Sequence, residues 1–157
     1  TMNNLIFGND KCSYYETICG GTGAGPNFDG TDAVHSHMTN TAITDPEILE
    51  WRFPVRLEKF SIRKRSGGEG IFNGGNGVIR ELLFTEAVSL SLLTQNRNQG
   101  PYGLDGGSQG TPGEQYLIKK GGNKIKLESF TQKSLETGDR LIIKTPGGGG
   151  FGDTKNV

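Results

Sequence analysis

The sequence has few cysteines, no long apolar run and no excess of either charge. Cys12 and Cys19 are too few for a disulfide-rich scaffold and do not form a Cys-x-x-Cys pair, so we expect a reducing, cytoplasmic setting. No stretch approaches the roughly 20 apolar residues of a membrane span, and no signal-peptide pattern opens the chain. With 17 basic and 17 acidic residues, the chain has no general attraction for nucleic acid or an anionic membrane, and we expect neither as a partner.

Glycine, by contrast, is present in excess: 26 of the 157 residues are glycine. Each glycine adds conformational entropy to the unfolded chain, so a domain this rich in glycine is difficult to stabilise on its own. The length fits one domain or one piece of a larger domain. We therefore expect a fragment of a larger α+β protein, with a Gly/His-rich active-site segment at 1–45 and a β-rich portion at 55–150.

Alternating apolar and polar residues after position 55 predict a mainly β fold. The expected strands are separated by clusters of Gly, Asn and Pro, which favour turns. Four irregularly spaced glycine pairs are interpreted as turns. They are Gly67-Gly68, Gly74-Gly75, Gly106-Gly107 and Gly121-Gly122. Short strands joined by glycine-rich loops are typical of an antiparallel sandwich or a barrel-like fold. The predicted strands are 57–62, 77–85, 88–95, 115–119, 124–128 and 139–144.

One short helix is predicted near 45–52. The run Thr44-Asp45-Pro46-Glu47 contains a capping residue, a proline suited to the first turn and a glutamate that can reach back to the cap. Pro54 should end this helix within about two turns, because proline lacks an amide proton and disfavours helical geometry at Phe53. A short helix therefore follows the histidine-containing segment.

A glycine run at positions 20–25 is the first candidate for a binding site. Glycine permits close approach and positive φ, so several backbone amides could face an anion here. Pro26 follows at once, so the run does not open a dinucleotide-binding helix, and the chain has no Gly-Lys-Ser/Thr of a P-loop. A phosphate site and a purely structural loop are both open interpretations. The residues concerned are Gly20, Gly21, Thr22, Gly23 and Gly25.

The two histidines, His35 and His37, stand one residue apart. On a strand this spacing points both imidazoles to the same face, which suits paired metal ligation or a metal ligand beside a proton carrier. Two histidines do not make a metal site without further donors. Carboxylates elsewhere could supply those donors, and structural, hydrogen-bonded histidines are an equally open interpretation. The candidate carboxylates are Glu16, Asp29, Asp32 and Asp45.

Two further positions carry chemically useful side chains. Cys19, beside the glycine run, could act as a nucleophile if oriented amides lowered its thiol pKa, although a small buried cysteine is the commoner case. Arg80 could hold a charge pair or bind a carboxylate. Because Arg80 and Glu81 are adjacent on a predicted strand, they face opposite ways, which favours separate partners over a mutual salt bridge.

Several motifs follow one another along almost the whole chain. They are Glu16-Thr17, Gly20 to Pro26, Val34 to Thr41, Ile43 to Glu50, Ser66-Gly67-Gly68, Gly74-Gly75, Gly77 to Glu81, Pro101 to Leu104 and Thr145 to Gly152. In this order they resemble the C-terminal part of the hydantoinase B/oxoprolinase family. The resemblance implies that residues 1–157 form a single C-terminal segment of a hydantoinase B-type domain.

The resemblance implies ATP-dependent hydrolytic opening of a cyclic amide, either 5-oxoproline to glutamate or a hydantoin to its N-carbamoyl amino acid. In such systems a hydantoinase A-like domain or subunit binds ATP and phosphorylates the amide oxygen, and the B-like part completes ring opening. A divalent metal such as Mg or Mn and an oligomeric assembly are also implied. A related ATP-dependent ketone carboxylase subunit and a noncatalytic interface module are the alternatives. The chain alone is expected to be inactive.

From this resemblance we expect an active site lined by Glu16, His35, His37 and Asn40. The first three would act as acid/base groups or metal contacts, with His35 and His37 as the metal ligands, and the Asn40 amide would orient the substrate. The glycine run at 20–25 and Arg80 would bind substrate or phosphate. In two places the chain departs from a pattern that often has arginine, which can alter substrate or affinity. These departures are Ala42 and Asn73.

Overall fold

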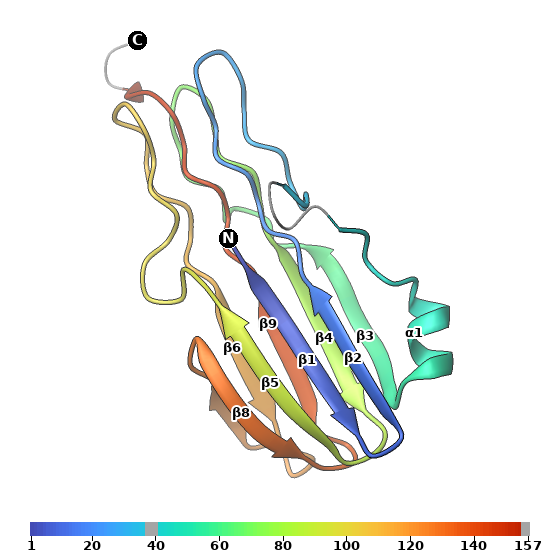
Figure 1. The fold of residues 1–157 in the computed structure, drawn as a ribbon. Helices are drawn as coiled ribbons and strands as arrows, with labels where there is room; N and C mark the ends of the chain where they lie inside the picture. Colours follow the sequence, from blue (N-terminus) through green and yellow to red (C-terminus); the bar gives the residue numbers. More distant parts are fainter. Residues whose placement is uncertain (37–40, 155–157) are drawn as a thin grey trace.

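The computed structural model describes residues 1–36 and 41–154, which form two antiparallel β-sheets facing each other (Figure 1). The first sheet has the order β2 (Cys12–Thr17), β1 (Asn3–Asn9), β5 (Val88–Thr94) and β8 (Phe130–Leu135). The second has the order β3 (Val55–Ile62), β4 (Val78–Phe84), β9 (Arg140–Lys144), β6 (Glu114–Ile118) and β7 (Lys124–Lys126). The predicted mainly β fold is confirmed, and it takes the sandwich form rather than the barrel-like one.

Every strand predicted after position 55 has a counterpart in the structure. Strands β1, β2 and β8 have no counterpart among the predictions. β1 and β2 form a hairpin inside the 1–45 segment, in which Asn9 pairs with Cys12 and Asn4 pairs with Thr17. The segment expected to hold the active site therefore begins as part of the sandwich.

The core between the sheets combines packed rings with leucines. The ring of Phe7 lies 5.0 Å from Tyr14, 5.4 Å from Phe84 and 6.2 Å from Phe53, measured between centroids. Tilted and edge-on ring pairs of this kind contribute about 0.5–1.5 kcal/mol beyond their burial. The surrounding leucines are at most 1% exposed, and they are Leu5, Leu49, Leu82, Leu90, Leu92, Leu117, Leu135 and Leu141.

Helix α1 (Pro46–Arg52) begins and ends as the sequence predicts. Asp45 caps it, because the carboxylate accepts hydrogen bonds from the amides of Glu47 at 2.9 Å and Ile48 at 3.4 Å. The extended backbone at Phe53, just before Pro54, ends it. The buried Leu49 holds the helix beside β3 (Figure 1). No helix in the described part of the chain is long and apolar enough to cross a membrane.

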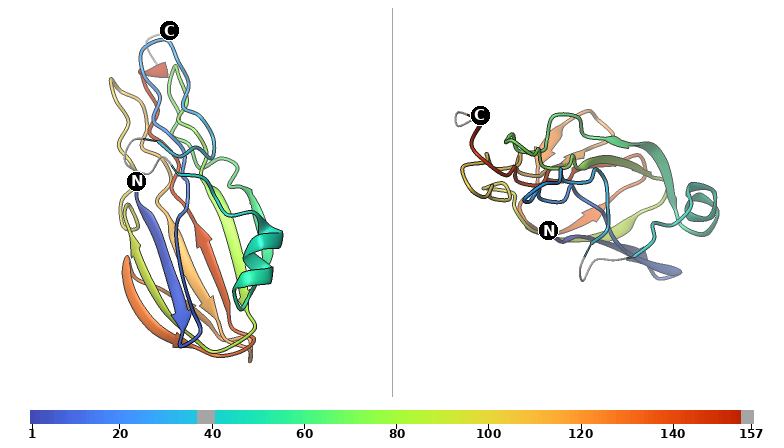
Figure 2. Two further views of the ribbon diagram at one scale, coloured as in Figure 1. Left: turned by 45° about the vertical axis from the view of Figure 1, so that its right-hand side comes forward. Right: turned by 90° about the horizontal axis from the view of Figure 1, so that it is seen from above.

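Beyond the strand ends, the glycine-rich segments run alongside one another as extended chains (Figure 2). Their hydrogen bonds recur every third residue. Gly147 and Gly150 donate to one neighbouring segment, and Gly148 and Phe151 donate to another. The acceptors are, in order, Thr111, Ser108, Gly75 and Phe72. Three residues per turn without internal hydrogen bonds is the geometry of a polyproline II helix. We call the segments 20–34, 66–76, 100–112 and 145–152 the glycine bundle.

The central segment of this bundle requires glycine because each residue lies against a different backbone. A Cβ added at any position from Gly147 to Gly150 would collide with a neighbouring carbonyl group. These carbonyl groups belong, in order, to Ser66, Thr22, Tyr102 and Glu69. The situation resembles that of collagen, in which glycine alone fits where chains meet.

The pairs Gly67-Gly68 and Gly74-Gly75 also lie inside the bundle, so their interpretation as turns is wrong. A Cβ on Gly74 would meet the carbonyl group of Gly148. The pair Gly121-Gly122 does fit the interpretation as a turn, since both residues face open space and Gly122 has a φ of +87°. Close chain approach, more than turn geometry, explains the glycine excess.

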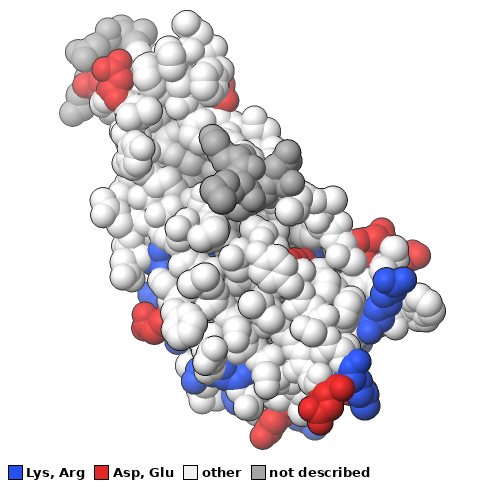
Figure 3. All heavy atoms as spheres, viewed as in Figure 1, with Lys and Arg blue, Asp and Glu red and all other residues white. Residues whose placement is uncertain are grey.

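The outer face of the β2-β1-β5-β8 sheet carries no charged side chain at its strand-paired positions. The registers align the outward residues in three cross-strand rows. In strand order these rows are Thr17–Asn4–Leu93–Phe130, Tyr15–Ile6–Ser91–Gln132 and Ser13–Gly8–Ser89–Ser134. Figure 3 shows this side of the molecule, with the charges gathered mainly toward its rim. We call these three rows the neutral face.

The outer face of the other sheet is rich in charge. Arg140 lies 3.0 Å from Glu81, and Lys144 lies 3.1 Å from Glu114. The ammonium group of Lys124 lies 4.0 Å from the ring centroid of Tyr116. Ion pairs with this partial access to solvent stabilise a fold by only about 0–1 kcal/mol each. We call it the charged face.

Asp139, just before β9, is a buried carboxylate that makes stability depend on pH. It accepts hydrogen bonds from Lys119 Nζ at 2.6 Å, from the amide of Glu136 at 3.0 Å and from the amide of Lys120 at 3.2 Å. Burial alone would raise its pKa, but these donors outweigh burial and hold the pKa below its ordinary value of 3.8. Since the folded-state pKa is depressed, the stabilisation is present above the ordinary pKa and disappears as pH falls through the folded-state pKa.

The substitution Asp139→Asn is expected to lower the free energy of unfolding by about 1–3 kcal/mol at neutral pH, because buried donors lose a charged acceptor. The difference from the unsubstituted protein should shrink below about pH 4, as the carboxylate is protonated first in the unfolded chain and, at lower pH, in the folded protein. Urea denaturation at neutral and acidic pH measures both values. A difference that stays constant with pH would contradict the role of the Asp139 charge.

Candidate functional site

Glu16 and Arg80 join the two sheets across the core. Glu16 on β2 and Arg80 on β4 both point inward, with side chains 6% and 2% exposed. Arg80 Nε donates to Glu16 Oε1 at 2.7 Å, and Nη2 donates to Oε2 at 3.0 Å. Two-pronged pairs of this kind are among the stronger charged hydrogen bonds. Glu81 pairs instead with Arg140, which confirms that Arg80 and Glu81 have separate partners.

Two aromatic residues join this ion pair in one cluster: Tyr14 is buried, and Phe60 is 42% exposed. The hydroxyl of Tyr14 donates to Glu16 Oε2 at 2.8 Å, and burial is the main reason that the pKa of Tyr14 rises to about 12. The ring of Phe60 lies 5.2 Å from the guanidinium carbon of Arg80. Both oxygens of Glu16 therefore already accept hydrogen bonds, and a substrate proton would have to replace one of them.

Cys19 lies close to this cluster and is buried. Burial raises the pKa of its thiol, with a smaller contribution from Glu16 in the same direction and an opposing one from Arg80. A raised pKa leaves less thiolate at neutral pH, so the structure favours a small buried cysteine over a nucleophile.

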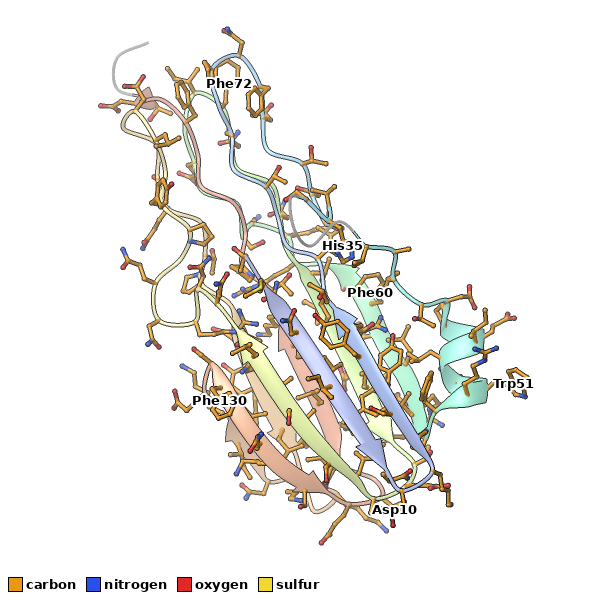
Figure 4. The ribbon with its side chains drawn as sticks, viewed as in Figure 1. Asp10, His35, Trp51, Phe60, Phe72 and Phe130 are labelled. Carbon is orange, nitrogen blue, oxygen red and sulfur yellow. The ribbon has the colours of Figure 1, made fainter. Side chains whose placement is uncertain are left out.

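His35 lies just beyond the end of β2 (Figure 4). The amide of the preceding Val34 donates to the carbonyl of Gly20 at 3.0 Å, which ties the histidine segment to the glycine run. His35 Nδ1 lies 3.4 Å from the hydroxyl of Thr41. The residue is in an irregular segment and not on a strand. His37 and Asn40, the other residues expected from this segment, lie outside the described residues.

The glycine run at 20–25 forms one wall of the glycine bundle. Several of its amides already donate to carbonyl groups, so an anion would have to compete with these bonds. The acceptors of Gly21, Thr22, Ala24 and Gly25 are, in order, Pro146, Thr31, Gly149 and Phe28. A ligand would therefore contact the exposed surface of the run without receiving hydrogen bonds from these four amides.

A cavity of about 640 Å³ opens beside the glycine run. Its walls are the backbones of residues 21–24 and 148–150, together with Ser36 and the side chains of Phe28 and Tyr102, which are 55% and 75% exposed. Among the described residues that line it there is no Lys, Arg, Asp, Glu or His. A small molecule that forms hydrogen bonds with a few backbone or hydroxyl groups suits such walls. Because Ser36 follows His35, the cavity adjoins the histidine segment.

The described residues do not fit the divalent metal that the family resemblance implies. They contain no group of three or more His, Cys, Asp or Glu side chains that could hold a metal ion. The carboxylates considered as oxygen donors each accept hydrogen bonds within the chain. The donors to Asp29, Asp32, Asp45 and Glu16 are, in order, Asn73, Asn76, the first turn of α1, and Arg80 with Tyr14.

Comparison with known proteins shows which family the chain belongs to. Residues 1–154 match the family model of hydantoinase B/oxoprolinase. The chain belongs to this family. It is 51% identical over 156 residues to 5-oxoprolinase of Dictyostelium discoideum, covering 99% of this chain and 12% of that protein. It is also 51% identical over 151 residues to 5-oxoprolinase 1 of Arabidopsis thaliana, covering 96% of this chain and 12% of that protein. The chain thus spans about 12% of the length of these curated relatives.

Two solved structures share the fold of this hydantoinase B/oxoprolinase chain. The ATP-dependent caprolactamase from Pseudomonas jessenii superposes with a TM-score of 0.77 at 27% identity, over 96% of this chain and 28% of that one. An acetone carboxylase superposes with a TM-score of 0.74 at 17% identity, over 96% of this chain and 25% of that one. At that identity the carboxylase demonstrates the common fold alone.

Three aromatic residues at the site of this hydantoinase B/oxoprolinase chain were not predicted from the sequence. Tyr14 sits next to the Glu16 motif, and Phe28 and Tyr102 stand beside glycine-rich motifs, so proximity to those motifs was the available signal. Of the two departures from the family pattern, Asn73 accepts a hydrogen bond from the amide of Gly70 at 3.3 Å. The other, Ala42, is exposed.

Proposed function

We propose that this chain contributes to an ATP-dependent hydrolase that opens a small cyclic amide, converting 5-oxoproline to glutamate or a hydantoin to its N-carbamoyl amino acid. The observation that carries the proposal is the cavity between the glycine run and Ser36, the residue that follows His35. Relatives named 5-oxoprolinase and a structural neighbour named caprolactamase support a cyclic amide as the substrate class.

The proposed reaction has to overcome the weak electrophilicity of an amide carbonyl. A hydantoinase A-like domain or subunit outside this chain would bind ATP and transfer its terminal phosphoryl group to the amide oxygen. Water would then attack the activated carbon, and the ring C–N bond would break as the nitrogen gains a proton. A second water would release the phosphate and leave the open-chain acid.

The residues of this chain are proposed to bind the ring and move its protons. Phe28 and Tyr102 would enclose the ring, and the glycine run would let its carbonyl approach the backbone closely. His35 would take a proton from the attacking water, the role that imidazole side chains most often fill in proton transfer. We also propose that His37 acts as a second acid/base or metal-contacting group. Asn40 would orient the substrate through its amide. Glu16 and Arg80 would support the site from the core.

Substituting His35→Ala, and separately His37→Ala, in the full-length protein with its hydantoinase A-like part tests these roles. Turnover should fall by about 100-fold or more, the usual range for a lost acid or base, while the melting temperature and the assembly stay unchanged. The matched control is Lys126→Ala on the charged face, which should leave turnover unaffected. Normal turnover in both histidine variants would remove these residues from the mechanism.

Turnover and binding measurements on the same proteins distinguish the alternative functions. Activity that requires bicarbonate and a ketone would identify a carboxylase subunit. Unchanged turnover in the histidine variants, together with lost binding of the ATP-binding part when the sheet surface is altered, would identify a noncatalytic interface module. Both outcomes would contradict the proposed hydrolytic role of this chain.

A further inference from the structure

The neutral face differs from an ordinary solvent-exposed sheet surface. Charged residues make up 22% of the chain, yet none occupies the three rows of this face. Four large side chains project from it, with Ile6 41%, Leu93 51%, Tyr15 59% and Phe130 64% exposed. Depletion of charge together with enrichment in aromatic residues is the compositional signature of an interface core.

Three of the polar side chains on this face are already paired with one another, which lowers the cost of covering them. The hydroxyl of Tyr15 lies 3.1 Å from that of Thr17, which donates to Asn4 Oδ1 at 3.0 Å. Removing a satisfied polar group from water costs much less than removing one that has no partner. The charged face of the other sheet offers a contrast within the same molecule, since its ion pairs would lose their hydration.

The size of the neutral face indicates what covers it. Four strands spaced about 4.8 Å apart, with six or seven residues rising about 3.3 Å each, give a sheet area of about 400 Å². A stable complex between separate proteins uses roughly 800 Å² on each partner. The face is too small for that, but it suits contacts within one polypeptide, which bury as little as about 600 Å² counting both sides. The curated relatives have ample further chain, because this segment spans 12% of their length.

We propose that in the full-length protein the neutral face packs against another part of the same polypeptide. The segment that covers it presents apolar and uncharged polar side chains to Ile6, Tyr15, Leu93 and Phe130. The proposal does not depend on the reaction that the protein catalyses. It concerns the face of the sandwich formed by β2, β1, β5 and β8, and not the cavity in the glycine bundle.

Cysteine labelling of the full-length protein tests this packing. Leu93→Cys and, as a smaller change, Ser91→Cys place probes on the neutral face, and Lys126→Cys places an exposed control on the charged face. Maleimide modification of each peptide is followed by mass spectrometry, under native conditions and in denaturant. We expect the neutral-face probes to react about 100-fold more slowly than the control in the native protein, as for sites that react only through local opening. In denaturant all three should react at similar rates.

Equal native rates at positions 93 and 126 would overturn the proposal. Protection that disappears on dilution would assign the face to a second copy of the chain, and protection that requires a separate ATP-binding subunit would assign it to that subunit. Either result would also overturn packing within one polypeptide. Protection that is independent of both concentration and added subunits supports it.

Discussion

Replacing Gly148 with alanine is expected to lower the free energy of unfolding by about 3 kcal/mol or more, in the upper range for an overpacked site. A Cβ at this position would meet the backbone carbonyl of Thr22. The chain cannot easily move aside, because Gly148 donates to Gly75 at 2.9 Å and accepts from Gly68 at 2.8 Å. The midpoint and slope of urea denaturation measure the change, and a lower midpoint with an unchanged slope is expected.

Gly121→Ala is the matched control for this substitution. A Cβ on Gly121 has no neighbouring atom within 4 Å, so the free energy of unfolding should change by less than about 0.5 kcal/mol. Equal stability of the Gly148→Ala variant and the unsubstituted protein would contradict the close chain packing of the glycine bundle.

Replacing Glu16 with glutamine is expected to destabilise the protein by about 3–5 kcal/mol, because a buried arginine loses its balancing charge. Arg80 is 2% exposed and has no access to bulk water that could compensate. The double substitution Glu16→Leu with Arg80→Met removes both charges and should cost less than the sum of the two single substitutions. Urea denaturation of the unsubstituted protein, of the single variants Glu16→Leu and Arg80→Met and of the double variant measures the coupling energy between the two side chains.

The exposed pair formed by Lys11 and Glu86 is the control for the buried one. Its atoms lie 3.2 Å apart, with side chains 77% and 48% exposed. Glu86→Gln should therefore change the free energy of unfolding by less than about 0.5 kcal/mol. Additive effects of the Glu16 and Arg80 substitutions would show that the two side chains do not stabilise each other.

The local parts of the fold could be predicted from the sequence, whereas the parts set by distant contacts could not. Helix α1 is coded within ten residues by Asp45, Pro46 and Pro54, so its ends are predictable. Strand β8 has polar residues at most of its positions. It pairs with β5 although β6 and β7 lie between them in the sequence, so the pairing gives no local signal. β1 contains a glycine and three asparagines, which favour turns over strands.

The glycine bundle shows a different limit of sequence reasoning. Its hydrogen bonds repeat every three residues, but the period belongs to the bonds between segments and not to the spacing of glycine in the sequence. Irregularly spaced glycine pairs therefore look like turns. Only the arrangement of the segments in space shows that a Cβ on Gly74 would meet the carbonyl of Gly148, and that one on Gly148 would meet the carbonyl of Thr22.

The sequence predicted which segment holds the candidate site, but not which side chains contact one another there. The motifs drew attention to Glu16, the glycine run and His35. Sequence could not show that Glu16 is held by Arg80, since 64 positions separate them and the pair forms only when the two sheets stack. Nor could it show that Phe28 and Tyr102 line the same cavity, because each comes from a different segment of the bundle.

The measurement that tests the proposed function most directly is release of glutamate from 5-oxoproline by the full-length protein together with its hydantoinase A-like part. The reaction is followed with and without ATP and a divalent metal, alongside the His35→Ala variant. We expect glutamate to appear with ADP, only in the presence of ATP, and to be lost in the variant. A folded, complete assembly that releases no glutamate and opens no hydantoin would contradict the assignment as a cyclic amide hydrolase.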